Sequence, residues 1–187
     1  MSSSLTDFPI LLYISSSAGI EAADVTAVFS ELGTNSKKIK VEDSLGDQLY
    51  VEIEKWNYTG TPATSEAWLW VKVPAINSGE DTHLTLYYDS TRNDNTAYVG
   101  DIGSIPGKNA WSSDHMAVYH LAQNTGGTTY DSTSNVNHSV TITSDPVFSE
   151  TSGKLGGAFI YPIIKMLLDG YPGVRHKAGC KGGIEKI

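Results

Sequence analysis

The stretch "AWLWVKVP", residues 67–74, alternates two kinds of side chain, and this alternation decides the fold class. In a β-strand, side chains i and i+2 point to the same face of the sheet. Leu69 and Val71 therefore share one face, whereas Trp68 and Trp70 stand side by side on the other. Two indoles left in water would lose roughly 2–3 kcal/mol of possible burial each. We expect the aliphatic face to form the core. We expect a ligand, a neighbouring module or a second copy of the chain to cover the tryptophan face.

Other short segments show the same alternation and are separated by turns rich in Gly, Asn, Asp and Pro. Such a pattern predicts an all-β fold, an antiparallel β-sandwich. A helical segment at 23–33 adds one short helix, with Asp24 expected at its N-cap and Gly33 just after its end. The turn "SLGD" predicts that the strands before and after it form a hairpin. The predicted strands of this part of the chain are 8–15, 37–43, 48–56, 66–74 and 83–89.

Strand 48–56 carries two glutamates on the face that also holds Trp56. At the i,i+2 spacing of a strand, Glu52 and Glu54 lie about 7 Å apart, a separation of interest for glycoside hydrolysis. Alternating glutamates are, however, typical of a strand face in contact with water. The sequence contains no nucleophile elbow, no P-loop and no dinucleotide-binding fingerprint. We therefore predict that the protein is not an enzyme.

The second half of the chain has fewer strand signals. Segments 115–121 and 140–143 are predicted as strands, and 152–161 approaches another through a Gly-rich turn. Beyond Ile164 the charge changes sign, because five of the 13 basic residues but only two of the 21 acidic residues follow it. We expect residues 162–187 to be an atypical tail, with the character of a truncated, spliced or frame-shifted end.

The segments "LTDFPILLYI", "KIKVEDSLGDQLYVEIEKWN" and "AWLWVKVP", followed by "THLTLYYDS", resemble an uncharacterised bacterial and archaeal surface domain, a domain of unknown function. In that family the domain precedes a concanavalin A-like or laminin-G-like jelly roll. The segments "AWSSDHMAVYHLAQ", "YDSTSNVNHS" and "SGKLGGAF" resemble the start of such a module. A jelly roll needs about eight strands, so only an incomplete jelly-roll-like segment is expected here. The resemblance implies a sandwich domain, a linker and a partial module over residues 5–100, 101–110 and 111–161.

Charge and hydropathy exclude two classes of partner. The chain has a net charge of −8 and a pI of about 5.0, and this balance argues against nucleic acid, whose phosphates need clustered Lys and Arg. No apolar run is long enough to span a membrane. The first residues, "MSSS", show no signal peptide pattern, yet the resemblance implies an extracellular or cell-surface location. A component of a virion or filament is the other possibility.

The candidate ligand site is the tryptophan face. Indole rings can stack on the apolar faces of sugar rings. If strands 48–56 and 83–89 are its neighbours, further side chains lie close to the indoles. The predicted ligand-binding residues are Trp68, Trp70, Lys72, Tyr87 and Tyr50. The alternative is that this face is buried at a junction between modules.

Clusters of Asp and Asn offer oxygen ligands for calcium, which takes six to eight oxygens. The alternative is ordinary turn chemistry, since Asp, Asn and Ser favour turns. The candidate calcium ligands are Asp89, Asn93, Asp94, Asp101 and Asp131. No other cofactor is expected. His120 matches a recurrent position of the family, and we predict a structural hydrogen-bonding role for it.

Three functions remain open. The first is a non-catalytic extracellular module for recognition or adhesion, which binds a glycan or a surface protein. The second is a structural subunit of a filament, coat or virion that self-associates through open edge strands. The third is an accessory fragment of a carbohydrate-active enzyme.

Overall fold

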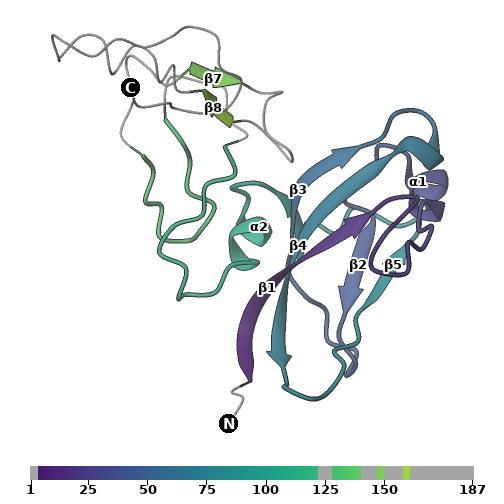
Figure 1. The fold of residues 1–187 in the computed structure, drawn as a ribbon, viewed down its shortest axis with the longest axis horizontal. Coiled ribbons are helices and arrows are strands. Elements are labelled where there is room, and N and C mark those ends of the chain that lie inside the picture. The colour runs from purple at the N-terminus through teal and green to yellow at the C-terminus, as the bar shows by residue number, and fades with distance from the viewer. Residues whose placement is uncertain (1–3, 122–127, 140–146, 150–157, 161–187) are drawn as a thin grey trace, which may run out of the picture.

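A computed structural model describes residues 4–121, 128–139, 147–149 and 158–160 of the chain (Figure 1). It confirms an all-β sandwich with only short helices. The strands are β1 (Leu5–Ile14), β2 (Ile39–Glu42), β3 (Val51–Asn57), β4 (Glu66–Ile76), β5 (Thr85–Tyr88), β6 (Val99–Asp101), β7 (Val147–Ser149) and β8 (Ala158–Ile160). The helices are α1 (Ala27–Leu32), α2 (Ile105–Asn109) and the 3-10 turn η1 (Pro62–Thr64).

Two sheets form the body of the sandwich. The larger has the order β1-β4-β3-β6, and the smaller is the pair β2-β5. Strands β1, β4 and β3 run antiparallel, as do β2 and β5, but β6 lies parallel to β3. The sheets are therefore antiparallel as predicted, with one parallel pair at the β6 edge. Strand β1 forms the opposite edge, where Pro9 is tolerated because an edge strand has unpaired N–H positions.

The predicted hairpin between strands 37–43 and 48–56 is wrong beyond its turn. The Leu49 N–H donates to the Val41 carbonyl at 2.8 Å, and the Asp43 N–H donates to the Asp47 carbonyl at 3.1 Å. Past this short ladder the two strands separate, because β2 pairs with β5 and β3 pairs with β4. Each strand has an aliphatic face. Placing them in opposite sheets lets those faces pack on each other, which strands of one sheet cannot do.

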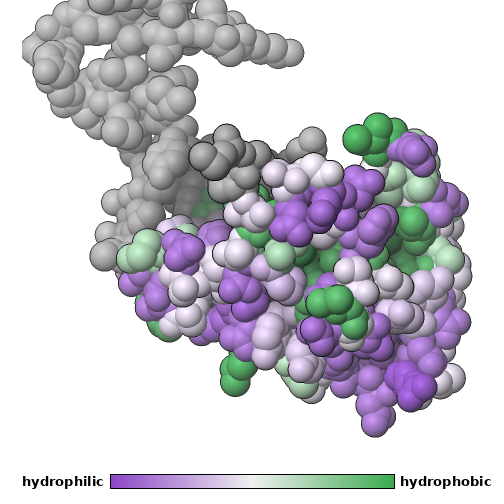
Figure 2. Space-filling view, turned by 90° about the horizontal axis from the view of Figure 1, so that it is seen from below, coloured by the Kyte–Doolittle hydropathy of each residue, from purple (hydrophilic) through white to green (hydrophobic). Residues whose placement is uncertain are grey.

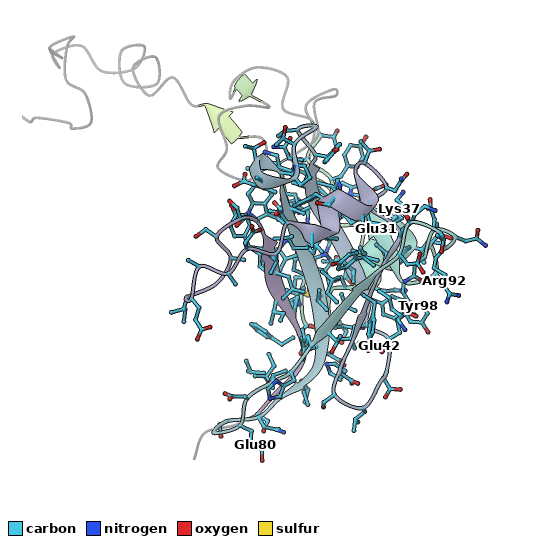
Figure 3. The ribbon with its side chains drawn as sticks, turned by 90° about the vertical axis from the view of Figure 1, so that its right-hand side faces the viewer. Glu31, Lys37, Glu42, Glu80, Arg92 and Tyr98 are labelled. Atoms are coloured by element: carbon cyan, nitrogen blue, oxygen red, sulfur yellow. The ribbon has the colours of Figure 1, made fainter. Side chains whose placement is uncertain are left out.

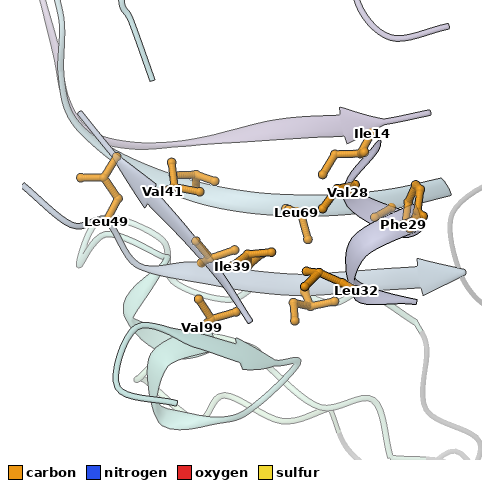
Figure 4. Packing of buried hydrophobic residues seen from close by; sticks show 13 residues of the cluster. Ile14, Val28, Phe29, Leu32, Ile39, Val41, Leu49, Leu69 and Val99 are labelled. Carbon is orange, nitrogen blue, oxygen red and sulfur yellow. The ribbon is translucent and has the colours of Figure 1, made fainter. Parts of the chain in front are cut away.

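The core lies between the two sheets and is aliphatic, as predicted from the alternation. Leu69 and Val71 of β4 are buried on the inner face of the larger sheet, and Ile39 and Val41 of β2 meet them from the smaller one. Figure 4 shows these strands crossing, with the side chains of α1 closing one end of the core. The α1 residues that do so are Val28, Phe29 and Leu32.

Helix α1 ends where the sequence predicts but begins later. Gly33 follows the helix with φ at 54°, a left-handed value that favours glycine, and its N–H donates to the Phe29 carbonyl at 2.9 Å. The predicted N-cap, Asp24, lies two residues too early. Its carboxylate instead accepts the N–H of Thr26 at 3.0 Å and the hydroxyl of Thr26 at 2.7 Å. Asp24 therefore orders the turn before the helix.

A β-bulge in β3 overturns the predicted position of Trp56. The register with β4 shifts between Ile53 and Lys55, which makes Glu54 the additional residue. A one-residue shift moves every following side chain to the other face. Trp56 consequently packs against the core, with its ring 5.1 Å from that of Phe29 and its Nε1 donating to the Gly33 carbonyl at 2.8 Å.

The second half of the chain is less regular than predicted. Residues 115–121 do not form a strand. They are held by other contacts, such as the N–H of Ser132 donating to the Val118 carbonyl at 2.8 Å. The predicted strand 140–143 and the tail 162–187 lie outside the described residues. Part of segment 152–161 forms β8, which pairs with β7. The predicted linker 101–110 contains helix α2.

The face seen in Figure 2 is largely hydrophilic, with hydrophobic side chains in separate groups. None of the helices found in the described ranges is long and apolar enough to cross a membrane.

Candidate functional site

The tryptophan face is covered by the chain itself. Helix α2 lies on the side of the larger sheet that faces away from β2 and β5 (Figure 1). Its approach is close: a Cβ atom at Gly107 would lie 2.6 Å from the Asp101 carbonyl oxygen and 3.3 Å from Cγ of Glu52. Glycine at this position therefore lets the helix backbone reach the sheet.

The two indoles of β4 meet different neighbours. The ring of Trp70 lies 5.1 Å from that of Trp111, which directly follows the α2 segment and is itself buried. Trp68 is 9% exposed, with the Tyr13 ring 5.1 Å away and Nζ of Lys55 5.3 Å above its own ring. The expected cover therefore exists. A later segment of the same chain covers Trp70. This matches the alternative that the tryptophan face is buried at a junction between two parts of the protein.

Beneath Trp111 lies a buried group of three ionisable side chains, here called the Glu–His cluster: Glu52, Glu54 and His120. His120 Nε2 lies 2.8 Å from a carboxylate oxygen of Glu52, and its Nδ1 lies 3.4 Å from a carboxylate oxygen of Glu54. The exposed fractions of the side chains are 0%, 7% and 4%. The prediction that the two glutamates face water is therefore wrong. The structural hydrogen-bonding role expected of His120 is confirmed.

Further donors complete the cluster. Trp111 Nε1 donates to Glu52 at 2.8 Å, and the Ser132 hydroxyl also donates to Glu52. Trp70 Nε1 donates to Glu54 at 2.6 Å. Strands β3 and β4 thus supply the carboxylates and one indole, whereas residues 111–132 supply the other indole, the imidazole and the hydroxyl. Buried charges need such partners, because desolvation without them is expensive.

The surroundings set the charge of His120. Burial alone would lower its pKa, but hydrogen bonds and attraction from Glu52 and Glu54 outweigh burial and raise the pKa to about 9. Burial raises the pKa of Glu54, yet the bonds from His120 and Trp70 leave it below the usual value. The imidazole is therefore cationic at neutral pH. With side chains at most 7% exposed, the cluster joins strand β3 to the segment that carries Trp111 and His120.

One signal in the sequence could have indicated this cluster. Glu52 lies opposite Trp70 in the β3–β4 register, so a buried tryptophan face would bury this glutamate too. The bulge at Glu54 and the approach of His120 from 68 residues away have no comparable signal.

The five predicted ligand-binding residues fall into separate places. Lys72 and Tyr50 form a local group, with Nζ of the lysine 5.4 Å from the ring and the Tyr98 ring stacked on Tyr50 at 5.0 Å. This group continues the tryptophan face along β4, because Lys72 lies two residues after Trp70 on the same side of the strand. Tyr87 belongs to β5 in the other sheet, so strand 83–89 is not a neighbour of the tryptophans.

A pocket of about 650 Å³ opens beside the smaller sheet and is here called the β2–β5 pocket. Two exposed tyrosines, Tyr87 and Tyr88, line it together with basic and amide side chains. Among the latter is Gln48, whose buried Nε2 has no hydrogen-bond partner. An unpaired buried amide is unfavourable, and because this nitrogen is buried a ligand in the pocket reaches it only if the Gln48 side chain moves. Of the predicted residues, Tyr87, Asp89 and Asn93 line this pocket.

The predicted calcium ligands do not converge. Asp101 pairs with Lys37 at 2.6 Å. Asp131 is buried, and its carboxylate accepts the N–H groups of Val118, Thr133 and Asn137. Asp89 accepts bonds within its own turn, as the turn-chemistry alternative proposes, while Asn93 and Asp94 are exposed. Over the described ranges, no group of three or more His, Cys, Asp or Glu side chains has the geometry to hold a metal ion.

Comparison with known proteins finds one family model that matches part of the chain. Residues 35–103 match the family described as "Domain of unknown function (DUF2341)". The match confirms the resemblance to a domain-of-unknown-function family over those residues and does not extend to a concanavalin-like module. No curated protein and no solved structure shows significant similarity to the chain.

Proposed function

We propose that this protein is a non-catalytic, extracellular module for recognition or adhesion that binds a saccharide in the β2–β5 pocket. The observation that supports it best is an exposed tyrosine ring, Tyr87, that lines a pocket together with basic and amide side chains. Aromatic rings stack on the apolar faces of sugars, and a few polar groups fix the orientation of the ligand.

The tryptophans have a smaller part in this proposal than the sequence implies. Trp68 is nearly buried, with Tyr13 and Lys55 against it, and Trp70 is half-buried with Trp111 packed on it. Tyr87, by contrast, is 46% exposed. Stacking on Trp68 and Trp70 stays a prediction, whereas the exposure of Tyr87 makes it the better aromatic platform.

A broad glycan array followed by calorimetry tests the proposal. We expect a saccharide to bind and Tyr87→Ala to weaken binding on the order of tenfold, because stacked aromatic contacts contribute about 1 kcal/mol or more. Tyr119→Ala is the matched control, since Tyr119 is equally exposed but does not line the pocket. Absence of binding across the array contradicts the proposal.

A second candidate function, self-association into a filament, coat or virion, is favoured by strand β1. This ten-residue edge strand exposes Leu5, Phe8 and Leu11. An open edge with apolar side chains readily accepts another strand. Sedimentation velocity at micromolar concentration separates the candidates: assembly that Leu11→Lys abolishes supports the structural role, whereas a monomer opposes it. A role as an accessory part of a carbohydrate-active enzyme would also need saccharide binding, and so shares the first test.

A further inference from the structure

We propose that the β2–β5 pocket selects acidic saccharides, and that Arg92 binds the sugar carboxylate. This inference rests on the proposed function, because it names the class of ligand that the same pocket takes.

Most of the charged side chains that line the pocket are positive, whereas the chain as a whole is negatively charged. The whole sequence carries a net charge of −8, yet three cationic residues, Lys38, Lys40 and Arg92, line the pocket against one carboxylate, Asp89. A concave site of one sign concentrates ligands of the other sign. An anionic ligand is therefore favoured here, whereas the overall charge of the protein would repel it elsewhere.

The two lysines already have partners. Nζ of Lys38 donates to the Ser90 carbonyl at 3.1 Å and also to the Arg92 carbonyl. Nζ of Lys40 pairs with Glu42 at 2.6 Å and lies 4.6 Å from the centre of the Tyr87 ring. Lys38 thus holds the loop and keeps an uncompensated charge, whereas the charge of Lys40 is compensated by Glu42, so Lys38 and Arg92 supply the positive potential of the pocket.

Arg92 keeps most of its donors available. Its side chain is 82% exposed, and its ion pair in the described structure is a single contact of 3.4 Å from Nε to Asp89. A guanidinium has five N–H donors in a planar fork, which suits bidentate binding of a carboxylate. Figure 3 shows Arg92 directed outward from its loop.

The loop that carries Arg92 is held in place. Asp89 accepts the Thr91 N–H at 2.8 Å and the Thr91 hydroxyl at 2.6 Å, and the Arg92 N–H donates to the Asp89 carbonyl at 3.3 Å. Glu31 of α1 accepts the Ser90 N–H at 3.1 Å. The guanidinium therefore starts from an ordered backbone, which lowers the entropy that binding must overcome.

Tyr87 supplies the complementary apolar surface, whereas Tyr88, the next residue of β5, points to the other face of the strand. A sugar ring stacked on Tyr87 could direct its carboxylate toward Arg92. A neutral sugar could use Tyr87 equally well but would leave most of the N–H donors of Arg92 without a ligand contact. We therefore attribute the expected difference in affinity between acidic and neutral saccharides to the Arg92 guanidinium.

The test uses the full chain and matched pairs of oligosaccharides. Oligouronates and sialylated oligosaccharides are compared with the same compounds after methyl esterification, which removes the charge and keeps the ring. We expect the acidic form to bind several-fold more tightly, because solvent screens an exposed ion pair even where the guanidinium binds the carboxylate through two hydrogen bonds. Affinity for the acidic form should also fall as salt rises.

Arg92→Gln should remove that preference while leaving the affinity for the esterified form unchanged. Lys108→Gln is the control, because Lys108 is a cationic residue outside this pocket. Equal binding of acidic and esterified forms, or an acidic preference that survives Arg92→Gln, overturns the inference and leaves the proposed function standing. No binding of any saccharide overturns the proposed function itself.

Discussion

Glu52 is the side chain on which the buried junction most depends. It is fully buried, and its carboxylate receives an indole N–H, a hydroxyl and an imidazole N–H. These donors come from Trp111, Ser132 and His120, all far along the chain from β3. A carboxylate in this position is stable only while its partners remain, so one residue links the sheet to the segment that covers it.

We predict that Glu52→Gln destabilises the protein by about 3–5 kcal/mol, because removing one partner of a buried ion pair leaves the other charge poorly compensated. The free energy of unfolding, measured in urea, checks this. Glu80→Gln is the control, since Glu80 is exposed and bonded only to the side chain of nearby Asn77. A change in Glu52→Gln as small as in the control would contradict the structural role of the cluster.

At the scale of elements, helix α2 is a short helix that depends on its cap and on its contacts with the sheet for stability. Ser104 caps it, with its side chain accepting the Gly107 N–H at 3.2 Å, and Pro106 stands in its first turn. Five residues are too few for an independent helix, so tertiary contacts must hold it. Gly100 of β6 leaves room for the side chains of Ser104 and Pro106, and Gly107 lets α2 approach the Asp101 carbonyl of β6.

We predict that Gly107→Ala lowers the melting temperature, although alanine has the better helix propensity by about 1 kcal/mol. The added methyl would meet the Asp101 carbonyl oxygen, a backbone atom, at 2.6 Å, so the helix must move away from the sheet. We expect a net loss of roughly 1–3 kcal/mol, the usual effect of overpacking. Lys108→Ala in the same helix should have little effect. A rise in melting temperature for Gly107→Ala would show that the helix does not pack closely.

At the scale of the whole molecule, the Glu–His cluster makes folding depend on pH. The pKa of His120 is about 9 in the folded protein and near 6.5 when the chain is unfolded. A group whose pKa rises on folding contributes stability below its unfolded value and loses that contribution as pH rises through its folded value. Glu54 has the opposite pH dependence, because its pKa is lowered on folding. Its contribution to stability is present at neutral pH and is lost as the pH falls through its folded pKa.

We therefore predict a loss of about 3 kcal/mol in the free energy of unfolding between pH 6.5 and 9.5, the linkage value of a shift of this size. Denaturation curves across that range measure it. His120→Gln should be less stable near neutral pH and should lack most of this decline. A wild-type stability that is flat over the same range would contradict a cationic His120.

The sequence by itself determined the class of fold and the face of each strand that forms the core. Alternation records burial directly, so Leu69, Val71, Ile39 and Val41 were identifiable as inward-facing, and Gly33 marked the end of α1 because a left-handed backbone favours glycine. Only the tertiary structure decided which strands pair, that a bulge turns Trp56 inward, and that Trp111 and His120 cover the tryptophan face. The physical reason is that these features depend on contacts between residues tens of positions apart. A local sequence pattern does not indicate which distant residues meet or how strongly they interact.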